Sequence, residues 1–241
     1  KVICFVTDIN GLKDDNADLL NEEIHFFRRL NLFIVHNQSM EAWLLGQHPG
    51  AKTAMIEFFD FPVKPHSGER RKSHAIAFAG YLVKSRFLSA LHVLSAIDFH
   101  IYGPRDSMVF SEQKNVLYHG VSMPYELPKS IEGSFGLVWD GDSIDGLEGA
   151  FGAYNAYISP HKLSLYLLAG LPVIAHVHSG AAALIRKYKI GFTVNSLSEI
   201  HSTISKMTEE EYQDMRRNGQ LLAARIATGD CLRSAFHQLG V

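Results

Sequence analysis

The stretch YISPHKLSLYLLAGLPVIAH, Tyr157 to His176, contains one complete unit of a parallel α/β fold. Apolar residues recur at helical spacing over Leu163–Ala169, and Gly170 predicts the end of that helix. The apolar run Leu171–Ala175 then predicts a buried strand. A helix, a tight turn and a strand therefore follow one another directly, which is the building block of a layered α/β protein.

The beginning of this helix carries an unusual arrangement of charge. Ser159 is a candidate cap and Pro160 suits the first helical position, yet His161 and Lys162 follow at the positive end of the helix dipole. Such a placement costs up to about 1 kcal/mol unless an anion binds there. We therefore expect an anion site at this helix start, the alternative being a surface lysine that tolerates a small penalty.

Composition narrows the class of protein. The chain has 241 residues, of which 46% are hydrophobic and 20% charged, so it can bury one large core or two moderate ones. A formal charge of -2 argues against nonspecific nucleic-acid binding, and no apolar run approaches the length of a membrane span. Cys4 and Cys231 lie far apart without metal or redox spacing, which suits a reducing compartment. We expect a cytoplasmic protein.

Strands alternate with helices nearly throughout, which predicts an α/β fold with parallel sheets. The alternation breaks at Phe61–Ser73, where two prolines, a glycine and a charge run predict a linker between two domains. We place the first domain at residues 1–66, the second at 67–220, and a final helix at 221–241 that could pack back on the first domain. Because the chain enters its first strand at once, we expect part of the first domain to be missing.

The same reading gives the individual elements. Strands are predicted at Val2–Val6, Leu32–His36, Thr53–Phe58, His74–Ala79, Phe99–Tyr102, Asn115–His119, Phe135–Trp139 and Phe192–Val194. Further helices are predicted at Leu19–Leu30, Ser39–Leu45, Ser85–Leu94, Tyr125–Ile131 and Gly180–Tyr188, and from about Ser198 onward. The glycine-rich segment Asp140–Ile158 has no clear period, which predicts a functional loop.

A second anion site is predicted in FAGYLVKSRFL, Phe78–Leu88. Ligands of open parallel sheets bind at the carboxyl ends of strands, and here a strand runs into Gly80, with Lys84 and Ser85 at the start of the next helix. Gly80 would let backbone amides approach a ligand, or it could serve as a simple turn. The spacing matches neither a P-loop nor the G-x-G-x-x-G of a dinucleotide site, so a nicotinamide-dependent oxidoreductase is disfavoured.

Three other motifs have a chemical and a structural interpretation. Asp8 ends the first strand and is either a general base facing a cleft between domains or the cap of a turn. The acids of WDGDS, Trp139–Ser143, resemble a metal-binding pair, but Asp-Gly after a strand is also a common turn, which we favour. His176 and His178 could bind a metal, but no third ligand of obvious spacing accompanies them. We expect no bound metal.

Three segments together resemble a known family, namely GAYNAYISPHKLSLYLLAGLPVIA, FAGYLVKSRFL and GLVWDGDS. They are similar to bacterial sugar-nucleotide-dependent glycosyltransferases of the GT-B architecture. Within that group the chain resembles β-1,6-galactofuranosyltransferase-like proteins and the glucosyltransferases that extend glycans on serine-rich adhesins. The resemblance extends to TDINGLK and LFIVHNQSM in the first domain, and it is most specific in the run that opens this subsection.

The resemblance implies two Rossmann-like domains that face each other across a cleft, with the acceptor on the N-terminal side and the nucleotide sugar on the C-terminal side. It implies that Lys162 and His161 contact the pyrophosphate. Other positions that it places around the nucleotide sugar are Gly80, Lys84, Ser85, Asn155, Tyr157 and Ser159. No cofactor is expected besides the UDP-sugar co-substrate, because fixed cations and helix amides would stabilise the departing UDP.

The expected activity is transfer of a hexosyl group, glucose or galactofuranose, from a UDP-sugar to a glycan or glycoprotein acceptor. In this interpretation Lys162 and Asp8 are catalytic, as leaving-group stabiliser and base. Many retaining members carry a glutamate-rich segment where this chain has HSGAAALIRKYKIG, which contains no acid and leaves the stereochemical outcome open. The alternative is a non-catalytic subunit that binds sugar or a partner enzyme. Apolar surface on the terminal helices could support a dimer or tetramer.

Overall fold

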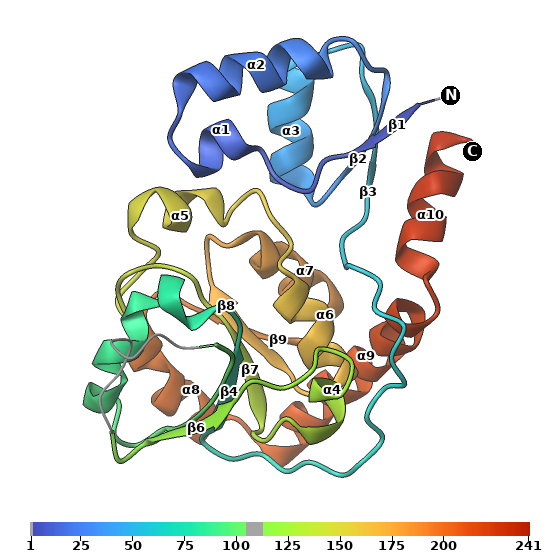
Figure 1. The fold of residues 1–241 in the computed structure, drawn as a ribbon. Helices are drawn as coiled ribbons and strands as arrows, with labels where there is room; N and C mark the ends of the chain where they lie inside the picture. The colour runs from blue at the N-terminus through green and yellow to red at the C-terminus, as the bar shows by residue number, and fades with distance from the viewer. Residues whose placement is uncertain (1, 105–112) are drawn as a thin grey trace.

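The computed structural model describes residues 2–104 and 113–241, except for the side chains of Lys84, Gly149, Ala150 and Phe151. Within these residues the strands form two parallel sheets, a small one of three strands and a large one of six (Figure 1). This confirms the predicted α/β class with parallel sheets. The linker predicted at Phe61–Ser73 contains no helix or strand and runs from the small sheet to the large one.

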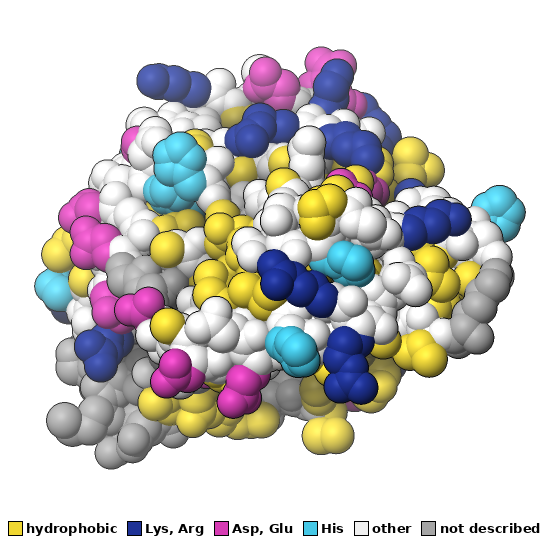
Figure 2. All heavy atoms as spheres, turned by 90° about the horizontal axis from the view of Figure 1, so that it is seen from above, with side chains coloured by type: hydrophobic (Ala, Val, Ile, Leu, Met, Phe, Trp, Pro, Cys, Tyr) yellow, Lys and Arg dark blue, Asp and Glu magenta, His cyan; other side chains and the backbone are white. Residues whose placement is uncertain are grey.

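The small sheet has the order β1-β2-β3, with β1 at Ile3–Phe5, β2 at Leu32–Val35 and β3 at Lys52–Met55. Three helices accompany it: α1 (Asn10–Lys13), α2 (Ala17–Phe27) and α3 (Gln38–Gln47). Asn16 and Asn37 cap α2 and α3 through their side-chain oxygens. Figure 2, which views the molecule from above this sheet, shows basic, acidic and apolar side chains interspersed over one face.

The large sheet has the order β6-β5-β4-β7-β8-β9, so the chain moves outward in one direction and then returns to extend the other edge. Its strands are β4 (Ala75–Ala79), β5 (Asp98–Tyr102), β6 (Val116–Gly120), β7 (Phe135–Val138), β8 (Val173–His176) and β9 (Gly191–Val194). The reversal occurs between β4 and β7, where parallel α/β sheets open a crevice for ligands.

Helices cover both faces of the large sheet (Figure 1). The helices that follow the linker are α4 (Leu127–Ser130), α5 (Gly149–Tyr154), α6 (His161–Leu168), α7 (Gly180–Tyr188), α8 (Ile200–Lys206), α9 (Glu209–Ala227) and α10 (Asp230–Leu239). Of these, α10 packs against β3 of the small sheet. One apolar cluster contains side chains from both sheets and from α6, α7, α9 and α10, including Ile34, Ala54, Val173 and Leu239. The two sheets are therefore joined by a shared core.

The C-terminal helices run back toward the small sheet. Thr208 and Glu211 form a capping box at the start of α9, and the boundary predicted at residue 220 falls within this helix. The Asp60 carboxylate accepts the backbone N–H groups of Cys231 and Leu232 at 3.1 and 2.7 Å, which fixes the start of α10. At its other end the Lys52 ammonium of β3 donates to the Leu239 carbonyl at 3.0 Å.

None of the helices in the described part of the chain combines the length and hydropathy needed to cross a bilayer.

Local structure differs from the prediction in three places. The helix expected at Ser85–Leu94 forms at Arg86–Val93 but is a 3₁₀ helix, and a non-helical Ser85 separates it from a short 3₁₀ helix at Leu82–Lys84. Its buried residues Phe87, Leu88 and Leu91 pack onto the sheet through the tighter turn. The loop expected at Asp140–Ile158 contains α5, and α1 forms in a segment for which no helix was predicted. Both helices are short, and α5 contains two glycines, so neither has an apolar period that the sequence could reveal.

Candidate functional site

The position of α6 is set by Tyr166, whose side chain is fully buried against the large sheet. The Tyr166 hydroxyl accepts the N–H of Ala79 at 2.9 Å and donates to the Leu137 carbonyl at 3.1 Å, thereby bonding α6 to the ends of β4 and β7. Lys162 lies one helical turn before Tyr166 and shares its face. The same contacts that lock the helix therefore also aim Lys162 at the crevice between β4 and β7.

Lys162 is directed inward. Only 16% of its side chain is exposed, and its ammonium donates to the Asp140 carboxylate at 2.7 Å while lying 4.6 Å from the centre of the Phe78 ring. A β-carbon on Gly80 would lie 2.8 Å from Lys162 Cε, so a larger residue at the end of β4 would displace the lysine. The anion expected at this helix start is, in this structure, a carboxylate of the chain itself.

Ser159 is not the cap of α6. The N-cap residue is Pro160, and none of the described side chains forms a capping hydrogen bond there. Ser159 is instead buried against His36, whose Nδ1 accepts the Ser159 N–H at 3.2 Å. Because this contact satisfies the Ser159 backbone from the small sheet, it ties the start of α6 to the N-terminal part of the chain.

A cavity of about 520 Å³ opens beside Lys162. Glycines and apolar side chains make up most of its wall: Phe59, Phe61, Ala79, Gly80, Tyr102, Gly103, Pro104, Val121, Met123, Pro124, Leu127 and Leu165, with Ser122, His161, Lys162 and Ser164 as polar members. The His161 ring stacks on Phe59 with centroids 3.9 Å apart, and burial lowers the His161 pKa against the opposing effect of Asp8. This large cavity therefore offers a neutral imidazole and an ammonium on an otherwise apolar surface.

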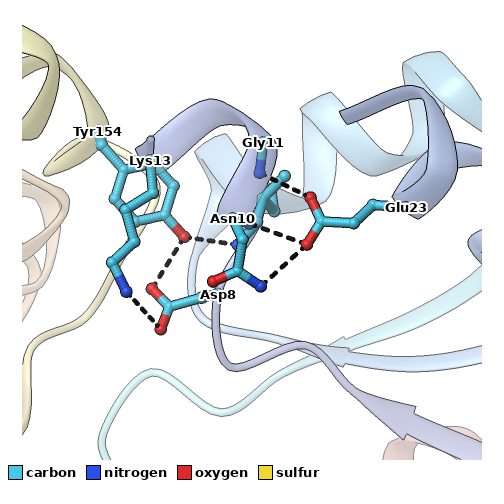
Figure 3. A network of polar contacts seen from close by, with 7 residues as sticks. Asp8, Asn10, Gly11, Lys13, Glu23 and Tyr154 are labelled. Atoms are coloured by element: carbon cyan, nitrogen blue, oxygen red, sulfur yellow. Dashed lines mark hydrogen bonds and ion pairs between the residues drawn. The ribbon is translucent and has the colours of Figure 1, made fainter. Parts of the chain in front are cut away.

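A second cavity of about 200 Å³ lies between the two sheets and is lined by Asp8, Lys13, Asp140, Gly141, Tyr154, Asn155 and Ile158. Figure 3 shows how Asp8 is held there. Lys13 donates to one carboxylate oxygen at 3.2 Å and the Tyr154 hydroxyl donates to the other at 3.2 Å. The same hydroxyl accepts the Ile9 N–H at 2.7 Å. Burial, reinforced by the charge of Asp8, raises the Tyr154 pKa, so Tyr154 stays a donor.

Glu23 on α2 holds the first turn of α1 in place. Its carboxylate accepts the backbone N–H groups of Asn10 and Gly11, both at 2.9 Å (Figure 3). The backbone that follows Asp8 is therefore fixed by hydrogen bonds to α2.

The small and large cavities share one boundary. Asp140 lines the small cavity and Lys162 lines the large one, and the ion pair between them joins the two. Asn155 reinforces this boundary by donating from Nδ2 to the Asp140 carbonyl at 3.3 Å.

His36 is a buried residue near this site, with 3% of its surface exposed. Its ring meets Phe59 edge-on at 4.9 Å between centroids, and burial lowers its pKa to about 4, with Asp8 opposing that shift. Because Nδ1 accepts from Ser159, the neutral ring carries its proton on Nε2, which is buried and has no hydrogen-bond partner among the described residues. The His36 ring is therefore uncharged at neutral pH.

The structure brings most of the residues predicted from the sequence to these two cavities. Gly80, His161 and Lys162 line the large one, while Asp8 and Asn155 line the small one. Tyr157 and Ser85 line neither cavity: Tyr157 is half-buried beside Tyr154, with ring centroids 6.1 Å apart, and Ser85 is buried. The Lys84 side chain lies outside the described residues.

The sequence did not identify Lys13, Phe59 or Tyr154 as members of the site, and it assigned Asp140 to a turn. A signal for Lys13 exists in TDINGLK, where a cation follows an acid by five residues. Tyr154 had none, because its hydroxyl reaches Asp8 across 146 positions of sequence. His176 and His178, the two histidines considered above as metal ligands, have ring centroids 5.4 Å apart, and His176 also packs edge-on against Trp139.

Comparison with known proteins covers both parts of the chain. Residues 76–239 match the family described as Glucosyltransferase 3-like, C-terminal domain, and residues 1–58 match the corresponding N-terminal domain. The chain is 30% identical over 215 residues to the Beta-1,6-galactofuranosyltransferase WbbI of Escherichia coli K12, a match that covers 87% of this chain. It is 31% identical over 218 residues to Glucosyltransferase 3 of Streptococcus gordonii, which covers 89% of this chain. Each match spans 63% of the relative's length.

Solved structures show the same architecture. Anabaena Alr3699/HepE, in complex with UDP-glucose, superposes with a TM-score of 0.67 at 14% identity, over 99% of this chain and 71% of that one. WaaG, a glycosyltransferase involved in lipopolysaccharide biosynthesis, gives 0.64 at 11% identity, over 99% and 75%. These similarities confirm the predicted GT-B fold. With both of its parts matched by the family, the chain belongs to the Glucosyltransferase 3-like glycosyltransferases.

Proposed function

We propose that this protein transfers a hexosyl group, glucose or galactofuranose, from a UDP-sugar to the hydroxyl of a glycan or glycoprotein acceptor. The observation that carries the proposal is the position of Lys162, an inward-facing ammonium at the boundary between an apolar cavity and a cavity containing a carboxylate. The names of the relatives support the choice of sugars, and the UDP-glucose complex of HepE supports the choice of nucleotide.

The large cavity suits the nucleotide part of the donor. Its apolar wall can contact the flat faces of a base and a ribose, while Gly80 and Gly103 allow close approach to the backbone. The diphosphate would then lie at Lys162 and at the first turn of α6, where the helix dipole and the ammonium both favour negative charge.

Binding of a diphosphate requires Lys162 to exchange one anion for another. In the structure the Asp140 carboxylate forms an ion pair with the Lys162 ammonium at 2.7 Å, and its negative charge would repel a phosphate placed nearby. We infer that Lys162 turns from Asp140 to the diphosphate as the donor enters. The carboxylate thus holds the lysine in the crevice in the absence of donor and competes with the donor for it.

The reaction breaks the bond between the anomeric carbon and the β-phosphate oxygen, and the electron pair remains on UDP. Lys162 stabilises that developing charge, which is the role of a preorganised cation in such a transfer. The acceptor oxygen forms the new bond to the anomeric carbon and must lose its proton. Asp8 is the proposed proton acceptor, held in place by Tyr154 and Lys13.

The test is the turnover of UDP-glucose and UDP-galactofuranose by the purified protein and by Lys162→Ala. The variant is expected to lose about 10²-fold or more in turnover, the scale seen when one charge-stabilising donor is removed. Lys187→Ala is the matched control, since Lys187 lies on the surface paired with Glu57 and its side chain is 57% exposed. Unchanged turnover in Lys162→Ala contradicts the assignment. Binding of UDP without any turnover by the unaltered protein favours the non-catalytic subunit.

A further inference from the structure

Three side chains with metal-binding atoms gather at an edge of the large sheet, outside the two cavities. His100 comes from β5, His119 from the edge strand β6, and Glu132 follows α4. One ligand atom from each lies within 4.8 Å of the others. His100 Nδ1 is 3.0 Å from His119 Nε2 and 3.6 Å from Glu132 Oε2. Within the described residues this is the group in which three such side chains meet.

An irregularity in the strand pairing creates this arrangement. His100 pairs with Leu117, but the register then shifts, so that Tyr102 pairs with Gly120 and His119 is an extra residue. Gly120 has φ +81°, a left-handed conformation that glycine adopts without strain. Because His119 is the extra residue, its side chain is redirected, and its ring stacks on Tyr102 at 4.6 Å and on His100 at 5.1 Å between centroids.

Glu132 is held in place through its backbone. The Arg70 guanidinium donates to the carbonyls on both sides of it, Ile131 and Gly133, each at 2.9 Å. The Glu132 N–H donates to the Tyr102 hydroxyl at 2.8 Å. The backbone of Glu132 is therefore fixed relative to β5, the strand that carries His100 and Tyr102.

Nearby cations are engaged elsewhere. Arg70 donates its third guanidinium contact to the Ala169 carbonyl at 2.9 Å, and Lys129 donates to both oxygens of Glu126 at 3.0 Å. Glu132 is 63% exposed and pairs with His100. Its carboxylate is thus directed at the histidines and not at these two cations.

We propose that His100, His119 and Glu132 bind a divalent transition-metal ion, with zinc as the best match. Ligand atoms at 2.0–2.2 Å from a tetrahedral zinc ion lie about 3.3–3.6 Å apart. His100 Nδ1 lies 3.6 Å from Glu132 Oε2 and 3.0 Å from His119 Nε2, and all three ligand atoms lie within 4.8 Å of one another, so small side-chain movements would bring them to these separations. Two imidazoles and one carboxylate form a ligand set that zinc uses, and the exposed side of the group leaves room for a fourth ligand from solvent.

The position of the site gives it a consequence for the large cavity. The chain between His119 and Glu132 supplies Val121, Met123 and Leu127 to the cavity wall, and the first two are 69% exposed. A metal held by His119 and Glu132 closes this segment at both ends and reduces the conformations open to it. The ion would therefore order one wall of the cavity from outside. Metal binding itself does not depend on the proposed transferase activity.

The test is titration of zinc into untagged protein that has been cleared of metal with a chelator. The protein is expected to bind one zinc ion per chain, and His119→Gln is expected to weaken binding at least about 100-fold, above the 10–100-fold typical for loss of an outer partner. Glu132→Gln should weaken it at least about 10-fold. Both substitutions are at exposed positions and should leave the fold intact.

His201→Gln is the matched control, because His74 and His201 form another stacked imidazole pair at 4.5 Å. It should leave zinc affinity unchanged. Cobalt provides a second measurement, since a four-coordinate Co²⁺ site absorbs strongly in the visible range and the band should disappear in His119→Gln. Failure to bind zinc at about 100 µM, or equal affinity in His119→Gln and the unaltered protein, overturns the site.

Discussion

The two cavities that meet at the Lys162–Asp140 ion pair differ in size and chemistry. The large one, about 520 Å³, is walled by glycines and apolar side chains, with Lys162 and His161 among its few polar groups. The small one, about 200 Å³, contains two carboxylates, a lysine, a tyrosine and an amide. The first is suited to burying a flat organic group, and the second to moving a proton. Under the proposed function, the large cavity binds the donor and the small cavity activates the acceptor.

The two cavities are linked through the ion pair of Asp140 with Lys162. Tyr154 and Asn155 are adjacent in sequence, and they fix Asp8 and Asp140 respectively. Under the proposed function, a change in the small cavity should affect catalysis, and a change in the large cavity should affect binding of the nucleotide.

The largest effect is expected from Asp8→Asn. An asparagine retains an acceptor for Tyr154 but does not take a proton, so turnover should fall by about 10²–10⁴-fold, the range for general acid–base groups. The affinity for UDP, measured by calorimetry, should change little because the donor lies on the other side of the boundary. Asp14→Asn is the matched control, since Asp14 is an exposed acid at the other end of α1. Equal losses in the two variants would contradict the role of Asp8.

The next effect is on stability and concerns the buried His36, which contacts Phe59 and Ser159. Its folded-state pKa of about 4 is below the ordinary 6.5, so the unfolded chain binds the proton more readily. The stabilisation is therefore complete above pH 6.5 and is lost as the pH falls toward 4, amounting to about 3 kcal/mol.

His36→Asn removes this titration while its side-chain oxygen still accepts the Ser159 N–H. Denaturant unfolding of both proteins at pH 8 gives the packing cost of the substitution alone. Between pH 7 and 4 the unaltered protein should then lose about 3 kcal/mol more than the variant does. Parallel curves would show that His36 titrates normally in the folded state.

A smaller effect is expected from Gly80→Ala in the large cavity. The added methyl group would lie 2.8 Å from Lys162 Cε, and the flexible lysine side chain can move aside at little cost to folding. Displacement of the ammonium should weaken UDP binding by about 10-fold, or about 1.4 kcal/mol, while the unfolding free energy changes by less than 1 kcal/mol. A loss of stability with unchanged UDP affinity would place the importance of Gly80 in packing.

The sequence predicted the large cavity better than the small one, for a physical reason. Gly80, His161 and Lys162 lie at the ends of regular elements whose order follows from apolar periodicity, so their convergence at the carboxyl edge of a parallel sheet could be anticipated. Asp8 was anticipated on the same basis, as a residue that follows a strand.

What the sequence did not reveal depends on contacts between distant segments. Tyr154 reaches Asp8 from α5, a short helix that has no apolar period and that forms against α1. The ion pair of Asp140 with Lys162, and the bulge that brings His119 to His100, are likewise set by tertiary packing and register. Local propensity carries no signal for such pairs.

The central claim is that the Lys162 ammonium, held by Asp140 in the absence of donor, is released to a diphosphate. The most direct measurement is calorimetric titration of UDP into the unaltered protein, Lys162→Met and Asp140→Asn side by side. We predict that Lys162→Met weakens UDP binding at least about 10-fold, whereas Asp140→Asn, which removes the competing carboxylate, binds UDP as tightly as the unaltered protein or more tightly. Equal weakening in both variants, or no weakening in Lys162→Met, would contradict the claim.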